Sequence, residues 1–473
     1  MYIRLLVAGG LFAGVTQTVS ATAQQSSPHD ATDRQASAAA VPSPGDLDSL
    51  VARANAASPQ LRAARARVDA ARARVRPAST LPDPVLMLGI INQPLGGMPA
   101  TSTPQGTMTT SDGPDPMTMR MIGVEQMIPY PGKRALRRRE AQHDADASEA
   151  ALDAAQRQVV RDVKSAYYEL AFLDKALGIV TQNHQLLASL VAVTEARYSV
   201  SAAAQQDVLK ARVEAARLGE TVAGLMERHR ATLAQLNAAL DRPSEAPVTA
   251  PSIPDAIAHA AIPSVSDEIH FASTLLGSRS ADSPLRPLLE LQEAAIRRSP
   301  DIRGRDAMIA AQSTRAELAR KDYLPDVGVS LQYGQRSGGL PDMVSAIVSV
   351  PIPIFKGRKQ DQAVVEATEQ VAVLDAERHA AVNAIRADVA RLVADIEQQR
   401  TRLALAVKAI LPQSRAALTS ATASYQVNKV DFLTVLASQA TVFSYETDYF
   451  RALSDFATNV AELERVVGEQ VLR

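Results

Sequence analysis

The sequence of 473 residues contains no cysteine and no tryptophan, and aromatic residues make up only 4% of it. The absence of cysteine excludes disulfide bonds and a lipid-modified N-terminal cysteine. The formal net charge of −1 gives no electrostatic reason to expect a nucleic acid as partner. The low aromatic content disfavours one large globular core, so we expect long helices that pack through small residues.

Long apolar runs are missing beyond the first residues. Arg4 precedes an apolar run over residues 5–15, and Ala21-Thr22-Ala23 has the small-x-small form of a cleavage site. We expect residues 1–23 to be a signal peptide and 24–45 a flexible lead-in; the alternative is an amphipathic or disordered start of a cytoplasmic protein. No later run reaches the ~18 to 20 apolar residues of a membrane-spanning helix, so any membrane insertion should use strands.

One pattern occurs twice, which predicts a single structure built of two similar halves, residues 46–241 and 288–473. Residues 242–287 are rich in Pro, Ser and Ala, and form either a plain linker or a segment with short elements packed outside. The matching motifs are Ser58-Pro59 and Ser299-Pro300, Leu81-Pro82-Asp83 and Leu324-Pro325-Asp326, Gly132-Lys133-Arg134 and Gly357-Arg358-Lys359, and Tyr198 and Tyr425.

Each half contains a long helix with a seven-residue apolar repeat, typical of coiled coils. The run from Lys133 to Tyr198 has no proline and predicts a helix of ~100 Å at ~1.5 Å per residue. The second run, from Arg358 to Tyr425, should kink or break at Pro412. The first repeat comprises Ala166, Leu170, Leu173, Leu177, Val180, His184, Leu187, Val191, Thr194 and Tyr198, so His184 is expected to be an interior packing residue.

Turns near 198–204 and 425–430 should reverse the long helices. Each turn leads into a second helix, from about Gln205 to Leu240 and from about Asp431 to Leu472. The helix segments of each half are therefore expected to run antiparallel.

Two β-hairpins are expected, over residues 84–128 and 326–354. In the second, apolar residues such as Val329 and Leu331 alternate with small polar ones such as Ser330, as in a barrel strand with lipid outside and water inside. The alternative is a two-stranded ribbon on a soluble core. Four strands cannot close a barrel, and open edges are not viable in lipid. Three copies would supply twelve strands.

These motifs resemble the TolC-like outer-membrane efflux channels over nearly the whole mature chain. Within this family, the chain is similar to the heavy-metal branch, the CusC- and CzcC-like proteins, in three stretches: Leu81 to Pro84, Asn92-Gln93-Pro94, and Gln126 to Arg134. The resemblance implies a mainly α fold with membrane β-hairpins: a coiled-coil α-barrel below a 12-stranded outer-membrane β-barrel shared by a homotrimer. It also implies a periplasmic adaptor (membrane fusion protein) and an inner-membrane resistance-nodulation-division pump as partners, in a Gram-negative cell.

The function that this resemblance implies is a passive exit duct for heavy-metal cations, either copper and silver or cobalt, zinc and cadmium. A drug-efflux or polypeptide-secretion duct is an alternative, and so is a periplasmic coiled-coil scaffold without a channel. We find no catalytic constellation, so the chain is not expected to be an enzyme or to carry a cofactor. The seven histidines include no pair at helical ligand spacing.

Methionines gather in the first hairpin and its loop, where seven of the eleven lie between Met87 and Met127. Thioethers favour soft ions such as Cu(I), although methionine also packs well on barrel walls. The candidate metal contacts are Met98, Met108, Met117, Met119 and Met121.

Basic residues follow each hairpin at equivalent places: Lys133, Arg134, Lys356 and Arg358. If the hairpins span the membrane, these residues should meet lipid phosphates at its periplasmic side. The alternative is a solvated helix start.

The family's helix-turn motif, Tyr-x-x-Gly, implies a gate and adaptor contact at the periplasmic tip. Tyr198 and Tyr425 match the motif, but Ser201 and Asn428 replace its glycines. The family's acidic ring falls on Asp207 in the first half. In the second half the equivalent position is Thr434, with Asp431 one turn earlier. The alternative for Asp207 is a favourable interaction with its helix N-terminus.

Overall fold

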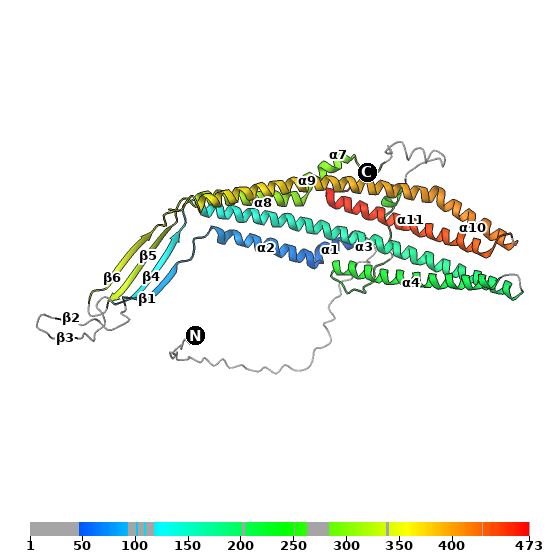
Figure 1. The fold of residues 1–473 in the computed structure, drawn as a ribbon, viewed down its shortest axis with the longest axis horizontal. Coiled ribbons are helices and arrows are strands. Elements are labelled where there is room, and N and C mark those ends of the chain that lie inside the picture. The colour runs from blue at the N-terminus through cyan, green and yellow to red at the C-terminus, as the bar shows by residue number, and fades with distance from the viewer. Residues whose placement is uncertain are drawn as a thin grey trace, which may run out of the picture. The chain divides into compact units, whose positions relative to one another are not determined.

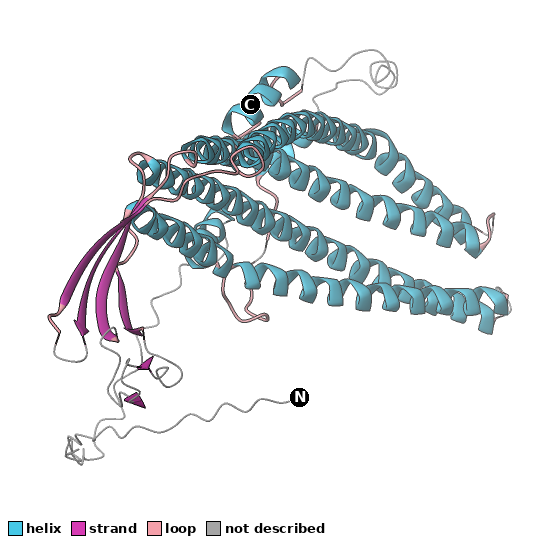
Figure 2. Ribbon diagram, turned by 60° about the vertical axis from the view of Figure 1, so that its left-hand side comes forward, coloured by secondary structure: helices cyan, strands magenta, loops and turns pink. Residues whose placement is uncertain are grey.

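The computed structural model describes residues 47–92, 101–102, 108–109, 118–200, 204–249, 251–262, 283–336, 340–427 and 429–472. Long helices and one four-stranded antiparallel sheet make up its regular structure (Figures 1 and 2). The helices are α1 (Leu47–Ala57), α2 (Pro59–Ser79), α3 (Lys133–Ser199), α4 (Gln205–Ala239), α5 (Asp255–Ala261), α7 (Leu288–Arg298), α8 (Pro300–Lys321), α9 (Gln360–Leu405), α10 (Leu411–Gln426) and α11 (Phe432–Val467).

The 67-residue α3 is the helix against which most others pack. Helices α2 and α4 follow one another along one side of it, and α8 and α11 do so along another (Figure 1). The second long helix, α9, packs on α8 and α11 in turn. The expected antiparallel arrangement of long and short helices is confirmed in both halves.

Beyond Leu170, one row of the predicted α3 seam is buried and the other is half-buried or exposed. The buried row consists of four residues spaced seven apart, Leu173, Val180, Leu187 and Thr194. They are at most 1% exposed because α4 and α11 cover them. The alternate row contains His184, which is exposed. The expectation that His184 is an interior packing residue is therefore wrong within one chain, because His184 is exposed and its neighbours in the row, Leu177 and Val191, are only half-buried.

The predicted interruption at Pro412 takes the form of a five-residue π-helix, η1 (Ala406–Ile410), between α9 and α10. Proline has no N–H to donate to the carbonyl four residues before it. A π turn, with its wider hydrogen-bond spacing, is a known way to accommodate such a loss without ending the helix. The backbone therefore stays helical from α9 into α10.

The sheet has the order β1-β4-β5-β6, with β1 (Val85–Ile91), β4 (Met119–Ile128), β5 (Val327–Arg336) and β6 (Met343–Ser349). The two predicted hairpins are present, and the antiparallel pair β4–β5 joins one half to the other. A second, two-stranded pair, β2 (Thr101–Ser102) and β3 (Met108–Thr109), lies in the first hairpin loop and was not predicted.

The segment between the halves carries α5, which packs against α9 and α11. Leu285 then forms a single antiparallel bridge with Leu472 near the end of the chain. This outer layer completes the largest buried cluster, around Leu392, Phe456 and Leu463.

Among the described residues, one helix, α3, is long and apolar enough to cross a membrane by length and composition. Its most apolar 18-residue stretch has a mean hydropathy of 1.2, and only 17% of that stretch is buried within the chain. The coiled-coil seam accounts for this composition, because the seam places apolar side chains on two rows of which only one is covered.

Candidate functional site

The four-stranded sheet has two chemically different faces. Adjacent residues in the strand register place one row of four side chains on one face, namely Leu88, Ile122, Tyr333 and Val344. All four are large and between 44% and 71% exposed. The next row falls on the opposite face and consists of Met87, Gly123, Gln332 and Ser345. These two rows show the predicted alternation of apolar and polar faces across all four strands. Val85, Ile91 and Ile347 on the second face, and Arg120 and Gln335 on the first, depart from it.

The polar face also gathers thioethers. Its following row is Gly89, Met121, Gly334 and Met343, and Met119 stands two residues from Met121 on the same face. The glycines make room for these side chains: a Cβ on Gly334 would lie 2.9 Å from Met119 Sδ, and one on Gly89 would lie 3.9 Å from Met121 Cε.

Of the five predicted metal contacts, Met119 and Met121 lie on this face. Met98 and Met117 lie outside the described residues, and the side chain of Met108 does too. Sequence reasoning missed Met87 and Met343. Their grouping depends on which strands pair and in which register. The only sequence signal was a small residue two positions after each, Gly89 and Ser345, on the same face of the strand.

The position of Lys133 contradicts the prediction that it meets lipid phosphates. Its side chain is 4% exposed, and its Nζ lies 2.9 Å from Oδ1 of Asp326 and 3.0 Å from Oδ1 of Asp322. A buried ammonium held by two carboxylates is not available to lipid phosphates. The residue instead joins the start of α3 to the start of β5.

The other predicted interface cations, Arg134, Lys356 and Arg358, are exposed. Arg134 Nε donates to the backbone oxygen of Ser79 at 2.8 Å, which places it over the end of α2. These three side chains therefore stand at the corner where the sheet meets the helices.

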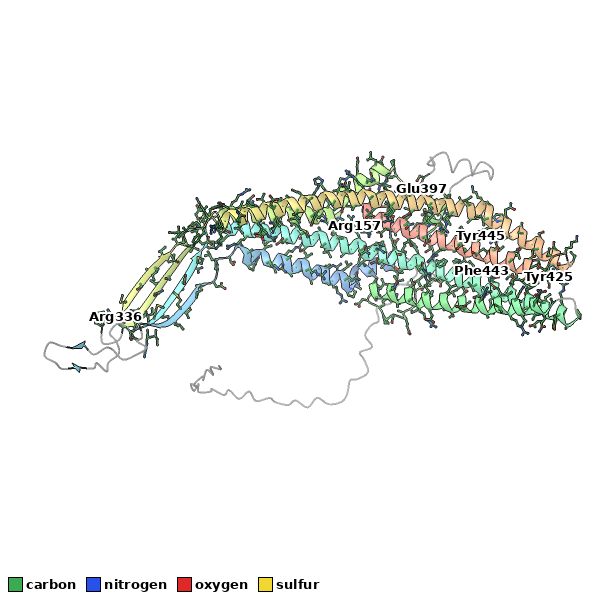
Figure 3. All side chains as sticks on the ribbon, in the orientation of Figure 1. Arg157, Arg336, Glu397, Tyr425, Phe443 and Tyr445 are labelled. Atoms are coloured by element: carbon green, nitrogen blue, oxygen red, sulfur yellow. The ribbon has the colours of Figure 1, made fainter. Side chains whose placement is uncertain are left out.

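The opposite ends of the long helices form a polar and aromatic tip, where Figure 3 labels Tyr425. The guanidinium of Arg197, in the last turn of α3, lies 4.6 Å from the centroid of the Tyr425 ring. Tyr425 also meets Phe432 edge to face at 5.9 Å. Arg197 therefore links the first-half tip to the second. Tyr198 is 47% exposed, and Ser201 and Asn428 lie outside the described residues.

The two candidate tip carboxylates have different environments. Asp207 is half-buried in the first turn of α4. Asp431 is the N-cap of α11, where its carboxylate accepts from the backbone N–H of Thr434 at 3.1 Å and from the Thr434 hydroxyl. These hydrogen bonds, chiefly the one from the hydroxyl, lower the pKa of Asp431. Asp431 therefore has a local structural role that its sequence position did not indicate.

The part of the chain that the structure describes contains no site for a resident metal ion. Within it, no group of three or more His, Asp or Glu side chains is placed to hold a metal ion.

Comparison of the whole chain with known structures shows the fold. Chains of similar structure include the outer-membrane channel OprN (20% identity, 89% of each chain covered, TM-score 0.69) and VceC from Vibrio cholerae (19%, 89% of this chain and 96% of that one, 0.67). CusC is also similar (16%, 89% and 92%, 0.68). No curated protein matches the sequence.

The sequence itself matches a protein family in both halves. Residues 50–241 and 291–469 match the model of the outer membrane efflux proteins. These two stretches carry the duplicated helices and all four strands of the sheet. The chain therefore belongs to the outer membrane efflux protein family, and it is a non-enzymatic efflux channel of tripartite systems that spans the outer membrane and extends into the periplasm.

Proposed function

We propose that three copies of this chain form one exit duct for heavy-metal cations, fed by a periplasmic adaptor and a resistance-nodulation-division pump. The observation that carries the proposal is the two-faced sheet, in which the row of Leu88 is apolar and the rows of Met87 and Gly89 on the opposite face consist of small, polar and thioether side chains. Such a sheet suits a wall between lipid and water.

The edges of the sheet support a shared barrel. Among the described strands, β1 pairs only with β4, and β6 pairs only with β5. An unpaired strand edge in lipid costs several kcal/mol for each backbone group. Joining β6 of one copy to β1 of the next satisfies these groups, and three copies of a four-stranded sheet give a closed barrel of twelve strands.

The helices support the same assembly. The most apolar part of α3 is largely uncovered, and exposed side chains such as Leu186 and Val193 are 47% and 50% accessible. A neighbouring copy would bury this apolar surface, including the row of His184. Each helical layer then closes into a tube with the same symmetry as the barrel.

The proposal of a metal cargo is based on the thioethers. Met87, Met119, Met121 and Met343 stand on the face that would line the duct, and thioethers are ligands for soft cations such as Cu(I) and Ag(I). We include Met98, Met108 and Met117 from the hairpin loop in this proposal. The motifs of the CusC- and CzcC-like branch point to the same cargo class.

The tip serves in this proposal as the gate and adaptor contact, formed by Tyr198, Ser201, Asp207, Tyr425, Asn428 and Asp431. Asp207 contributes the charged constriction, because Asp431 is already engaged as a helix cap. Arg134, Lys356 and Arg358 form the interface with lipid phosphates, without Lys133.

The experiment that tests this function is sensitivity profiling of a deletion strain. Restored growth on copper or silver salts when the gene is returned supports metal export. Sensitivity confined to organic drugs would contradict the metal cargo and leave the channel assignment intact. Conductance of the purified protein in planar bilayers tests the duct itself.

A further inference from the structure

The helix pairs of the two halves meet at equivalent junctions, and these junctions differ in charge. Asp241 lies two residues after the end of α4 and is bonded to Arg62 at the start of α2, whereas Gly468 directly follows α11 and contacts Arg157 of α3. Both residues have positive φ, 52° and 80°, as a helix-ending left-handed residue does. Both junctions therefore contain a left-handed residue just after the helix.

In the first junction a carboxylate fills the site. Asp241 Oδ2 accepts from Arg62 Nη2 of α2 at 2.8 Å. In the second junction the equivalent residue is Gly468, which has no side chain. A Cβ on Gly468 would overlap the guanidinium of Arg157, a residue of α3. A cation thus stands where the other half has an anion.

The acids around Arg157 are already bonded to other cations. Asp153 accepts from Arg303 at 2.5 Å, and Glu464 from Lys164 at 2.6 Å. Glu469 is bonded to Arg286 and Arg298, and Glu462 to Arg161 and Arg465. Each nearby carboxylate therefore has a cation other than Arg157 as its partner.

Arg157 itself is only partly satisfied. Its Nη2 donates to the backbone oxygen of Arg298 at 2.8 Å, whereas its Nη1 is buried and has no hydrogen-bond partner among the described residues. Burial and the positive charges of Arg303, Arg298 and Arg465 lower its pKa, and Asp153 is the one acid that acts against them. The guanidinium is thus surrounded by more positive than negative charge.

A cavity of about 400 Å³ adjoins this group, lined by Arg157, Arg161, Lys164 and Arg465 together with Asp153, Glu464 and Glu469. We propose that this cavity binds a small oxyanion of the phosphate class, held by the Arg157 guanidinium. The planar fork of arginine suits two oxygens of one anion, and the cavity has room for a phosphate ion or a small phosphomonoester.

The bound oxyanion takes the electrostatic place that Asp241 occupies in the first half. It neutralises Arg157 and bridges α3 to the end of α11, beside the turn between α7 and α8. The site lies among the helices, and it is independent of the cargo proposed for the duct.

The test is equilibrium dialysis of the full-length protein, assembled in detergent, against labelled inorganic phosphate at constant ionic strength. We expect one saturable site per chain that sulfate competes for and chloride at equal ionic strength does not. Binding that rises only in proportion to phosphate concentration, or that chloride removes equally well, would overturn the proposal.

Variants locate the site. Arg157→Gln should lose saturable binding, and Arg157→Lys should weaken it about tenfold or more, because lysine keeps the charge but lacks the fork. Arg230→Gln, on the exposed surface of α4, is the matched control and should bind as the wild type does. Phosphate should also raise the unfolding temperature of the wild type and of Arg230→Gln by more than that of Arg157→Gln. An Arg157→Gln protein that still binds phosphate saturably would place the site elsewhere.

Discussion

Lys133 at the start of α3, whose side chain is buried, and the half-buried Asp326 at the start of β5 form an ion pair, with 2.9 Å between Nζ and Oδ1. The backbone N–H of Tyr130 donates to the same carboxylate oxygen at 2.8 Å. The pair therefore joins residues from the two halves of the duplicated chain at the corner where β4 turns into α3. It is one of the contacts that set β4 beside β5.

Replacement of Lys133 should destabilise the chain. Lys133→Met leaves Asp326, 26% exposed, without its ammonium partner, and we expect a loss of about 2–4 kcal/mol, lower than for a fully buried pair. Thermal unfolding in detergent, followed by circular dichroism, measures the change. Arg358→Met is the matched control, since Arg358 occupies the equivalent place in the second half and is exposed. Equal effects of the two substitutions would contradict the role given to the pair.

The same corner should weaken in acid. Burial alone would raise the pKa of Asp326, but hydrogen bonds from Tyr130 and Lys133 and the charge of Lys133 lower it below its ordinary value of 3.8. A lowered pKa stabilises the folded state above the ordinary value, and this contribution is lost as pH falls through the lowered one. Unfolding temperatures measured between pH 6 and pH 2 should fall less for Asp326→Asn than for the wild type. Parallel pH profiles would contradict this.

A charged substitution should destabilise the protein on one face of the sheet and be tolerated on the other. Leu331→Arg places a cation on the apolar face and should destabilise the membrane-inserted protein by about 2–4 kcal/mol if it lies near the bilayer midplane. Gln332→Arg, the next residue, faces the other way and should be tolerated. Heat-resistant oligomer on gels and yield in outer-membrane fractions provide the measurement. Tolerance of both substitutions would favour a water-exposed ribbon.

Oligomerisation should be obligatory. Mass measurement in detergent should return three copies, because the edges β1 and β6 and the uncovered row of α3 each need a neighbour. A stable folded monomer with the four-stranded sheet intact would refute the shared barrel.

Loss of the thioethers should lower metal tolerance without loss of assembly. The triple variant Met87→Leu, Met119→Leu and Met121→Leu keeps side-chain volume but removes sulfur from the polar face. Copper and silver tolerance should fall severalfold at normal expression. Met226→Leu with Met308→Leu, on α4 and α8, is the control and should have no effect. Unchanged tolerance in the triple variant would assign these methionines to packing alone.

Removal of Asp207 should reduce the cation selectivity of the duct and its block by multivalent cations from the periplasmic side. Three carboxylates near the axis would attract cations, and salt screens such an effect. Single-channel conductance measures both properties. Glu220→Ala, on the exposed surface of the same helix, is the control. Wild-type selectivity in Asp207→Ala would leave Asp207 as a residue that only favours its helix N-terminus.

The sequence by itself determined the duplicated architecture. Helix length follows from the absence of proline between Lys133 and Tyr198, and the π-helical interruption of the second long helix follows from Pro412. Strand alternation in β5 identified the two faces of the sheet, because side chains on a strand alternate by geometry alone. All of these signals are local, so a single chain segment is enough to read them.

Only the tertiary structure decided the roles of individual charged and sulfur-containing side chains. Lys133 looked like a surface cation, and it is buried because Asp322 and Asp326, nearly two hundred residues later, fold onto it. His184 looked interior and is exposed, Met87 and Met343 share a face through strand pairing, and Arg157 fills the space left by Gly468. Burial and pairing depend on which distant segments meet, and a periodic pattern along one segment carries no information about its partner.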